Sequence, residues 1–334
     1  MKKIININYI CIIVCSVFFI SCKTETPSEA VVLLQLENEK PQFCSADDSI
    51  LIPIPFNLWD MKVIDDKAVF FSPGRNNYGV IYDLKNKKEI EQIGKKGKGP
   101  DEFLSCNLCH MNEKSQFALY DIVKKELATF REEKGCFIKD DIYELPQYED
   151  GYGKPYTAIM QYANTKFLMK EDGDETYMHL MDLSAQKVLA SYHCDLRKKN
   201  TAYTPYDFIF DFIGNNILLA YCYFDRYEIL HIDNNSLTPS YYCGEEEFKT
   251  IPSDYDDLMY VNLCIRTFGK EFFILKSQGG TDNGDIINII NMETKVQRTV
   301  RLDKKIKLFD IDAFGAIWGY NEAENGSIIY KYNL

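Results

Sequence analysis

Hydrophobic residues recur along this chain in short runs, some alternating with polar residues and some continuous, and turn residues separate the runs. The runs are rich in Tyr, Phe, Ile and Val, which favour extended strands. No long segment keeps the three-to-four-residue spacing of an amphipathic helix. The pattern therefore predicts an all-β chain.

The runs group into a repeated unit of four predicted strands. In the first copy the strands cover residues 60–65, 67–73, 79–84 and 89–94. One position of the third strand recurs at separations of 48, 51, 51, 58 and 42 residues, and it is occupied by Tyr82, Phe130, Met181, Ile232, Ile290 and Tyr332. This period is typical of the four-stranded blades of a β-propeller.

The sixth copy stops after three strands, and the run AVVLLQL at 30–36 is a predicted strand without a blade of its own. We expect that run to complete the last blade, because a borrowed strand closes the ring and removes an exposed edge. The sequence predicts one domain, 30–334, which is a six-bladed β-propeller with four-stranded blades and a ring closed by an N-terminal strand. A seven-bladed ring or a pair of β-sandwiches is the alternative, and the regular spacing argues against sandwiches.

The N-terminus has the features of an export signal. Lys2 and Lys3 precede a short apolar run that ends in FISC, where Ser21 comes directly before Cys22. Such a segment is typical of a bacterial lipoprotein signal peptide, although Phe19 stands where Leu is usual. We expect a signal at 1–21, acyl chains on Cys22 and a polar tether at 22–29, hence an exported lipoprotein anchored in the outer membrane. The alternative is a transmembrane anchor, for which the clean apolar run is short.

The charge balance limits the possible partners. The formal net charge is −12, and without Lys2 and Lys3 it is −14, with 36 basic residues against 50 acidic ones. This balance argues against nucleic acid, whose phosphates attract basic surfaces. The membrane contact that we expect is the lipid anchor on Cys22.

The stretch IGKKGKGPDEF, residues 93–103, resembles a phosphate-binding loop in composition. The P-loop pattern, however, requires Ser or Thr after the lysine and a following helix, and both are missing from the sequence. Glycines allow positive φ and Pro100 fixes one φ, so the stretch suits a sharp turn between two blades. We interpret it as a structural corner, which leaves room for a weak anion nest.

The same stretch carries a family resemblance. The spacing of Gly94, Gly97, Gly99, Pro100, Glu102 and Phe103, behind a lipoprotein signal, resembles the TolB-like six-bladed β-propeller lipoproteins of Bacteroidota. Asp101 departs from the pattern, because a glycine is common at that position. The resemblance implies the propeller fold and a location in the cell envelope. It implies no activity, since most members have no known function.

Cys106, Cys109 and His110 match the C-x-x-C-H pattern of covalent haem attachment. The segment is a predicted inner strand, however, and side chains three apart on a strand point to opposite faces. We therefore expect a packed strand at these positions and no cofactor. The remaining cysteines of the exported chain lie mostly in apolar runs, which predicts few or no disulfides.

Other candidate chemistry is weak. The acidic loops at 171–176 and 279–285 lack the EF-hand calcium pattern. His179, His193 and His231 are scattered, and the sequence has no nucleophile elbow. We therefore assign no catalytic or metal-binding residue.

The predicted connections between blades are long, polar and rich in tyrosine, and we expect them to emerge on one face. Tyrosines among charged residues suit the recognition of peptides or sugars, although they can also simply seal the propeller. The candidate ligand-binding residues are Arg75, Tyr78, Lys96, Lys98, Tyr152, Tyr156, Tyr206 and Tyr255.

Two functions are compatible with the sequence. The first is a non-enzymatic binding module of the cell envelope that recognises a protein, peptide or glycan through the loop face. The alternative is a propeller enzyme of the lactonase, lyase or glycan-processing type, with a metal in the central channel. Carboxylate, Asn or His side chains that converge on the axis would favour the enzyme.

Overall fold

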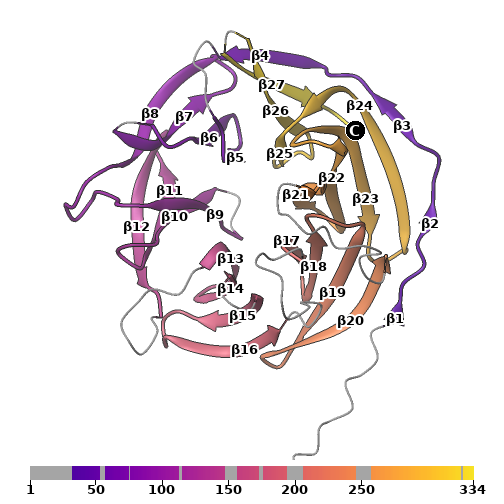
Figure 1. Ribbon diagram of the computed structural model, residues 1–334. Helices are drawn as coiled ribbons and strands as arrows, with labels where there is room; N and C mark the ends of the chain where they lie inside the picture. The colour runs from indigo at the N-terminus through magenta and orange to yellow at the C-terminus, as the bar shows by residue number, and fades with distance from the viewer. Residues whose placement is uncertain are drawn as a thin grey trace, which may run out of the picture. The chain divides into compact units, whose positions relative to one another are not determined.

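The computed structural model describes residues 32–52, 57–74, 76–112, 115–146, 156–172, 176–193, 206–245, 257–324 and 326–334. These residues form an all-β propeller, in which the sheets are arranged in a ring around a central axis (Figure 1). Within these ranges no helix is long and apolar enough to cross a membrane. The predicted signal at 1–21, Cys22 and the tether at 22–29 lie outside the described residues.

Most strands belong to antiparallel quartets that run in chain order from an inner to an outer strand. The first quartet is β5 (Asp60–Ile64), β6 (Lys67–Phe71), β7 (Asn77–Asp83) and β8 (Lys88–Lys95). The second is β9 (Cys106–His110), β10 (Gln116–Asp121), β11 (Glu126–Glu133) and β12 (Cys136–Glu144). The third is β13 (Tyr156–Ala163), β14 (Lys166–Asp172), β15 (Thr176–Asp182) and β16 (Lys187–His193).

The quartets continue in the second half of the chain. The fourth is β17 (Phe208–Ile213), β18 (Asn216–Tyr221), β19 (Arg226–Asp233) and β20 (Ser236–Gly244). The fifth is β21 (Tyr260–Phe268), β22 (Glu271–Gly280), β23 (Gly284–Asn291) and β24 (Val296–Ile306). The last is β25 (Leu308–Ile311), β26 (Ile317–Ala323) and β27 (Gly326–Tyr332), which β4 (Asp48–Ile52) completes. The six marker residues of the repeat all lie on third strands, as the sequence predicts.

The N-terminal segment runs along the outside of the ring (Figure 1). β1 (Val32–Leu33) pairs in parallel with β20, whereas β2 (Glu37–Asn38) and β3 (Gln42–Cys44) pair in parallel with β24. Only β4 reaches the last quartet, where it pairs antiparallel with β27. The prediction that 30–36 closes the ring is therefore wrong, because the described part of that run pairs with the outer edge of the fourth quartet.

The alternation of side chains explains why β4 is the closing strand. Ile50 and Ile52 are buried in the core between the last and first quartets, while Leu51 between them is 58% exposed. Val32 and Leu33 of β1, in contrast, are 56% and 46% exposed. A strand that closes a sheet must turn one face to the core, and β4 does so whereas β1 does not.

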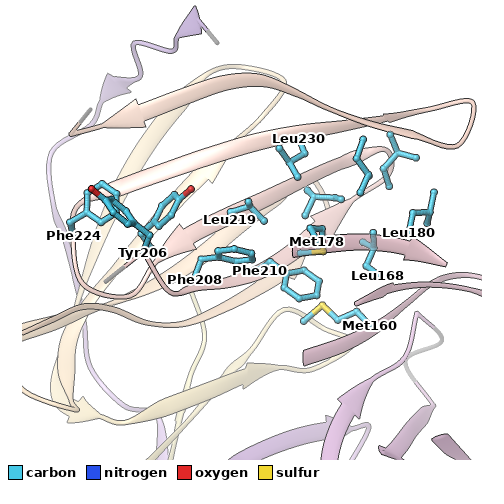
Figure 2. Close-up of a cluster of buried hydrophobic side chains, with 14 residues drawn as sticks. Met160, Leu168, Met178, Leu180, Tyr206, Phe208, Phe210, Leu219, Phe224 and Leu230 are labelled. Carbon is cyan, nitrogen blue, oxygen red and sulfur yellow. The ribbon is translucent and has the colours of Figure 1, made fainter. Parts of the chain in front are cut away.

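Clusters of buried side chains lie between neighbouring quartets. In Figure 2, Leu168 and Met178 of the third quartet pack with Phe208, Phe210 and other side chains of the fourth. The cysteines of β9 belong to two such clusters, since Cys106 packs towards the first quartet and Cys109 towards the third. This confirms that the two thiols point to opposite faces, and burial raises the pKa of both. The seven described cysteines are free thiols.

We predict that truncating a buried side chain of the closing strand β4 strongly destabilises the protein. Replacing Ile50 by Ala should lower the free energy of unfolding by about 2–5 kcal/mol, because it leaves a cavity in the core at the ring junction. The matched control is Leu51→Ala on the same strand, which should change stability by less than about 0.5 kcal/mol. Urea denaturation measures both values, and equal effects of the two substitutions would contradict the assignment of β4.

Candidate functional site

Two cavities lie along the axis of the ring, between the inner strands. The larger, of about 580 Å³, opens where the connections between quartets arrive, and Trp59, Asp207 and Lys307 line it just before or at the start of inner strands. We call it the connection-side cavity. The smaller, of about 270 Å³, lies at the inner hairpins and includes Gly214 and Gly269. We call it the hairpin-side cavity.

A network of ion pairs lies between the two cavities. The Arg266 guanidinium donates from Nη2 to Asp60 Oδ1 at 2.6 Å and from Nε to Asp310 Oδ1 at 3.2 Å. His110 Nε2 lies 3.1 Å from Asp60 Oδ2, and Lys62 Nζ lies 3.7 Å from Asp310 Oδ2. The network therefore joins inner strands of the first, second, fifth and last quartets.

Two of the carboxyl groups near Arg266, those of Asp60 and Asp211, have opposite pKa shifts. Burial alone would raise the pKa of Asp60, but the charges of His110 and Arg266 and hydrogen bonds from His110 and the Met61 N–H outweigh it and lower the pKa to about 2. Burial raises the pKa of Asp211 on β17, against the Phe212 N–H and the charges of Arg266, His110 and Lys62. Asp60 is therefore a carboxylate at neutral pH, and Asp211 is the group closer to protonation.

Two lysines in the wall of the connection-side cavity each pair with two acids. Lys170 Nζ contacts Asp207 Oδ1 and also lies 3.0 Å from Asp172 Oδ2, above the ring of Phe208. Burial alone would lower the pKa of Lys170, but Asp207 and Asp172 raise it, so this ammonium stays charged. Lys307 Nζ lies 2.8 Å from Asp282 Oδ2 and 2.9 Å from Glu322 Oε1.

The axial carboxylates do not form a metal site. Asp60 and Asp310 both bind Arg266, and Asp310 Oδ2 also accepts the Val63 N–H at 2.6 Å. Across the described residues, no group of three or more His, Cys, Asp or Glu side chains is placed to hold a metal ion. A cation at this point would have to displace the guanidinium, so the residues present do not fit the metal of the alternative enzyme hypothesis.

The described tyrosines among the predicted ligand-binding residues lie in the core. Tyr156 and Tyr206 are fully buried, and Tyr206 packs edge-on against Tyr221 and Phe224. Tyr78 stacks on Phe71 and donates its hydroxyl to the carbonyl of Leu104. Their observed role is packing, and a role in ligand binding stays a prediction without an exposed surface to support it.

The described lysines among the predicted ligand-binding residues do not line the axial cavities. Lys96 lies over the Tyr78 ring, 4.6 Å from its centroid, and Lys98 is exposed on the loop after β8. Neither lysine lines an axial cavity. Arg75, Tyr152 and Tyr255 lie outside the described residues.

The glycine-rich loop at 94–103 satisfies its own polar groups. The Glu102 carboxylate accepts the Gly99 N–H at 2.9 Å and pairs with Lys95 Nζ at 2.7 Å. Gly97 N–H donates to the Phe103 carbonyl. The Glu102 carboxylate therefore occupies the place in which a bound anion would sit.

Glycine is favoured at different positions of this loop for different structural reasons. Gly94 has a φ of 64°, which favours glycine. At Gly97 a Cβ atom would lie 2.0 Å from Glu102 Oε2, and φ is 156°, so both the carboxylate and the backbone favour glycine there. Phe103 is buried between the first and second quartets, and Lys124 Nζ donates to the carbonyls of Gly99 and Glu102.

Sequence reasoning missed the polar residues of the inner strands. Asp60 and Lys62 alternate with buried Met61 and Val63, which places them on the axial side, and this alternation was the available signal. A second missed group is the chain of hydrogen bonds from Glu171 to His179 (2.9 Å) and from His179 to Ser191 (2.8 Å). Glu171, His179 and Ser191 line neither axial cavity, and their hydrogen bonds satisfy buried polar groups of the third quartet.

Comparison with known proteins supports the fold. No family model and no curated protein matches the chain. A solved structure described as a "Putative exported protein" from Bacteroides fragilis NCTC 9343 is similar with a TM-score of 0.55 and 13% identity, over 90% of this chain and 95% of that one. A member of the DUF4221 family from Bacteroides vulgatus ATCC 8482 has a TM-score of 0.55 and 11% identity, over 86% and 97%. At these identities the likeness shows the propeller fold alone, and the TolB-like relationship stays a prediction.

We predict that Gly97 is required because of Glu102. Gly97→Ala should lower the free energy of unfolding by about 1–2 kcal/mol, since the new Cβ displaces the carboxylate from the Gly99 N–H and Lys95. In a Glu102→Ala background the same substitution should cost less but not nothing, because the carboxylate is gone while the φ of 156° at Gly97 still disfavours a side chain. A double-mutant cycle in urea measures the coupling. An undiminished cost in that background would show that backbone conformation, and not the carboxylate, requires the glycine.

Proposed function

We propose that this protein is an exported lipoprotein of the cell envelope that binds a protein, peptide or glycan through the face that carries the connections between quartets. The observation that carries the proposal is the cavity of about 580 Å³ that opens on this face. Its volume lies within the range of about 300–1,000 Å³ that small-molecule sites and recognition pockets occupy. Its lining combines aromatic and apolar side chains with fixed charged groups, as such sites do.

The proposed scaffold is a six-bladed propeller in which each quartet is one blade. The pairing of β4 with β27 supports this count, because it supplies the strand that the last blade lacks. The second and third quartets are joined in one sheet only through the parallel pair Met160 and His110, which is a local contact between two inner strands. A closed ring of this kind presents all its connections on two opposite faces, and one of them is then available for a partner.

We predict that acylation of Cys22 anchors the protein in the membrane. Cys22→Ala should prevent attachment of the acyl chains, and the protein should leave the membrane fraction or keep its signal peptide, since several chains hold it far more firmly than a protein surface does. Fractionation with mass spectrometry of the N-terminal peptide tests this. An acylated protein in the variant would contradict the role of Cys22.

The enzyme hypothesis has one supporting feature. Asp60, His110, Asp211 and Asp310 do converge on the axis, and His110 borders both cavities. The acids, however, are held by Arg266, Lys62 and backbone N–H groups, and the set does not suit a metal ion. Binding therefore has more support than catalysis. Chemical turnover of a bound ligand, with loss of turnover in His110→Gln, would reverse this order.

We predict that blocking the mouth of the connection-side cavity abolishes ligand binding. Thr157 is exposed on its wall, and Thr157→Trp should fill the mouth without changing the core. The matched control is Thr238→Trp, at an exposed position of the outer strand β20. The measurement is the rise in melting temperature caused by panels of neutral oligosaccharides, acidic oligosaccharides and unstructured peptides. A ligand that stabilises wild type and the control but not Thr157→Trp supports the proposal, whereas equal responses of the two variants contradict it.

A further inference from the structure

The charged residues that line the connection-side cavity are matched in pairs. Its acidic side chains are Asp60, Asp207 and Asp282, and its Lys and Arg side chains are Lys170, Arg266 and Lys307. Each acid contacts one of these cations: Asp60 contacts Arg266, Asp207 contacts Lys170, and Asp282 contacts Lys307. Each cation also has a second acidic partner that does not line this cavity, namely Asp310, Asp172 and Glu322 in the same order. Apart from His110, the formal charge of the described residues in this lining is therefore zero, although the chain as a whole carries −12.

This pairing selects against a charged ligand. An anion would have to draw Arg266, Lys170 or Lys307 away from its carboxylate, and at Arg266 and Lys170 the abandoned carboxylate, Asp60 or Asp207, is partly buried. A cation would do the same to the acids. A ligand rich in hydroxyl groups avoids this cost, because a hydroxyl both donates and accepts. It can donate to the remaining carboxylate lone pairs and accept from the remaining ammonium or guanidinium N–H groups.

The rim of the same cavity offers flat apolar surfaces. The indole of Trp59 is 59% exposed, and it packs edge-on against Phe71, with ring centroids 6.4 Å apart. Tyr260 is 39% exposed and rests against Tyr223 at 5.2 Å. Trp59 and Tyr260 both line the cavity. Exposed rings that are held from behind suit the C–H faces of a pyranose or furanose, which combines a flat apolar face with an equatorial belt of hydroxyls.

We propose that the connection-side cavity binds a neutral saccharide, with Trp59 stacked on one sugar ring and the three matched ion pairs hydrogen-bonded to its hydroxyls. The inference rests on the proposed binding function and narrows it to one ligand class. Peptides are less well matched, because their recognition uses open strand edges or apolar pockets for side chains. The ion pairs remain intact when the saccharide binds, so the bound and free cavities have the same charge.

The test compares neutral oligosaccharides, uronate-containing or sulfated oligosaccharides, and unstructured peptides by isothermal titration calorimetry. We expect wild type to bind a neutral oligosaccharide, with a Kd that changes less than about twofold between low and high salt, since no charge is neutralised. Trp59→Ala should weaken binding about tenfold, and Trp59→Phe should recover most of that loss because it keeps an aromatic face. The matched control is Phe314→Ala on the β25–β26 hairpin, where the ring is 85% exposed and lines neither axial cavity, and its Kd should equal that of wild type.

The outcomes separate the two proposals. If an acidic oligosaccharide or a peptide binds more tightly than every neutral sugar, and Thr157→Trp blocks it, the cavity is a binding site and the saccharide inference is wrong. The inference is also wrong if Trp59→Ala leaves the Kd of a neutral sugar unchanged. If no class binds, or Thr157→Trp blocks none of them, the proposed function fails and the inference fails with it.

Discussion

Arg266 places a guanidinium at the axis of the ring, where it is almost fully buried. Such a charge is costly to bury alone, and the loss of one partner from a buried pair costs about 3–5 kcal/mol. Asp60 comes from the first quartet and Asp310 from the last, so the need to satisfy Arg266 holds the two ends of the ring to the fifth quartet. The junction of first and last quartets is thus fixed twice, by these ion pairs at its inner side and by β4 at its outer side.

The same ion pairs shape the cavities. Arg266, His110 and Met160 border both, so they form the floor between the connection-side and hairpin-side spaces. Because Asp60 and Asp310 hold Arg266 in place, this floor exists before any ligand arrives. A preformed cavity spares a ligand the cost of ordering side chains, which otherwise reduces affinity by about 0.5–1.5 kcal/mol for each immobilised side chain.

The fold was largely predictable, because strand periodicity and the repeat are local properties that the sequence displays. The opposite directions of Cys106 and Cys109 followed from the period of a strand alone. The sequence predicted the wrong closing strand because AVVLLQL at 30–36 is more hydrophobic than DSILI at 48–52. Closure depends instead on which strand turns one face towards the core. The axial site could not be predicted, since residues 206 apart in sequence, such as Asp60 and Arg266, meet only through the ring topology. The tyrosines could not be assigned a role from the sequence for a related reason. Composition does not distinguish an aromatic ring that packs in the core from one that contacts a ligand.

The glycine-rich loop and the axial cavity obey one physical rule. In the loop, Lys95 and the Gly99 N–H hold Glu102, and in the cavity, Lys170, Arg266 and Lys307 each hold an aspartate. Charges that look available in the sequence are consumed by partners within the chain. An external anion at either place would have to replace an internal carboxylate that is already positioned, and that competition favours the carboxylate. The proposed binding function would then depend on ligand groups that can add hydrogen bonds to a satisfied ion pair, and on the exposed rings at the rim.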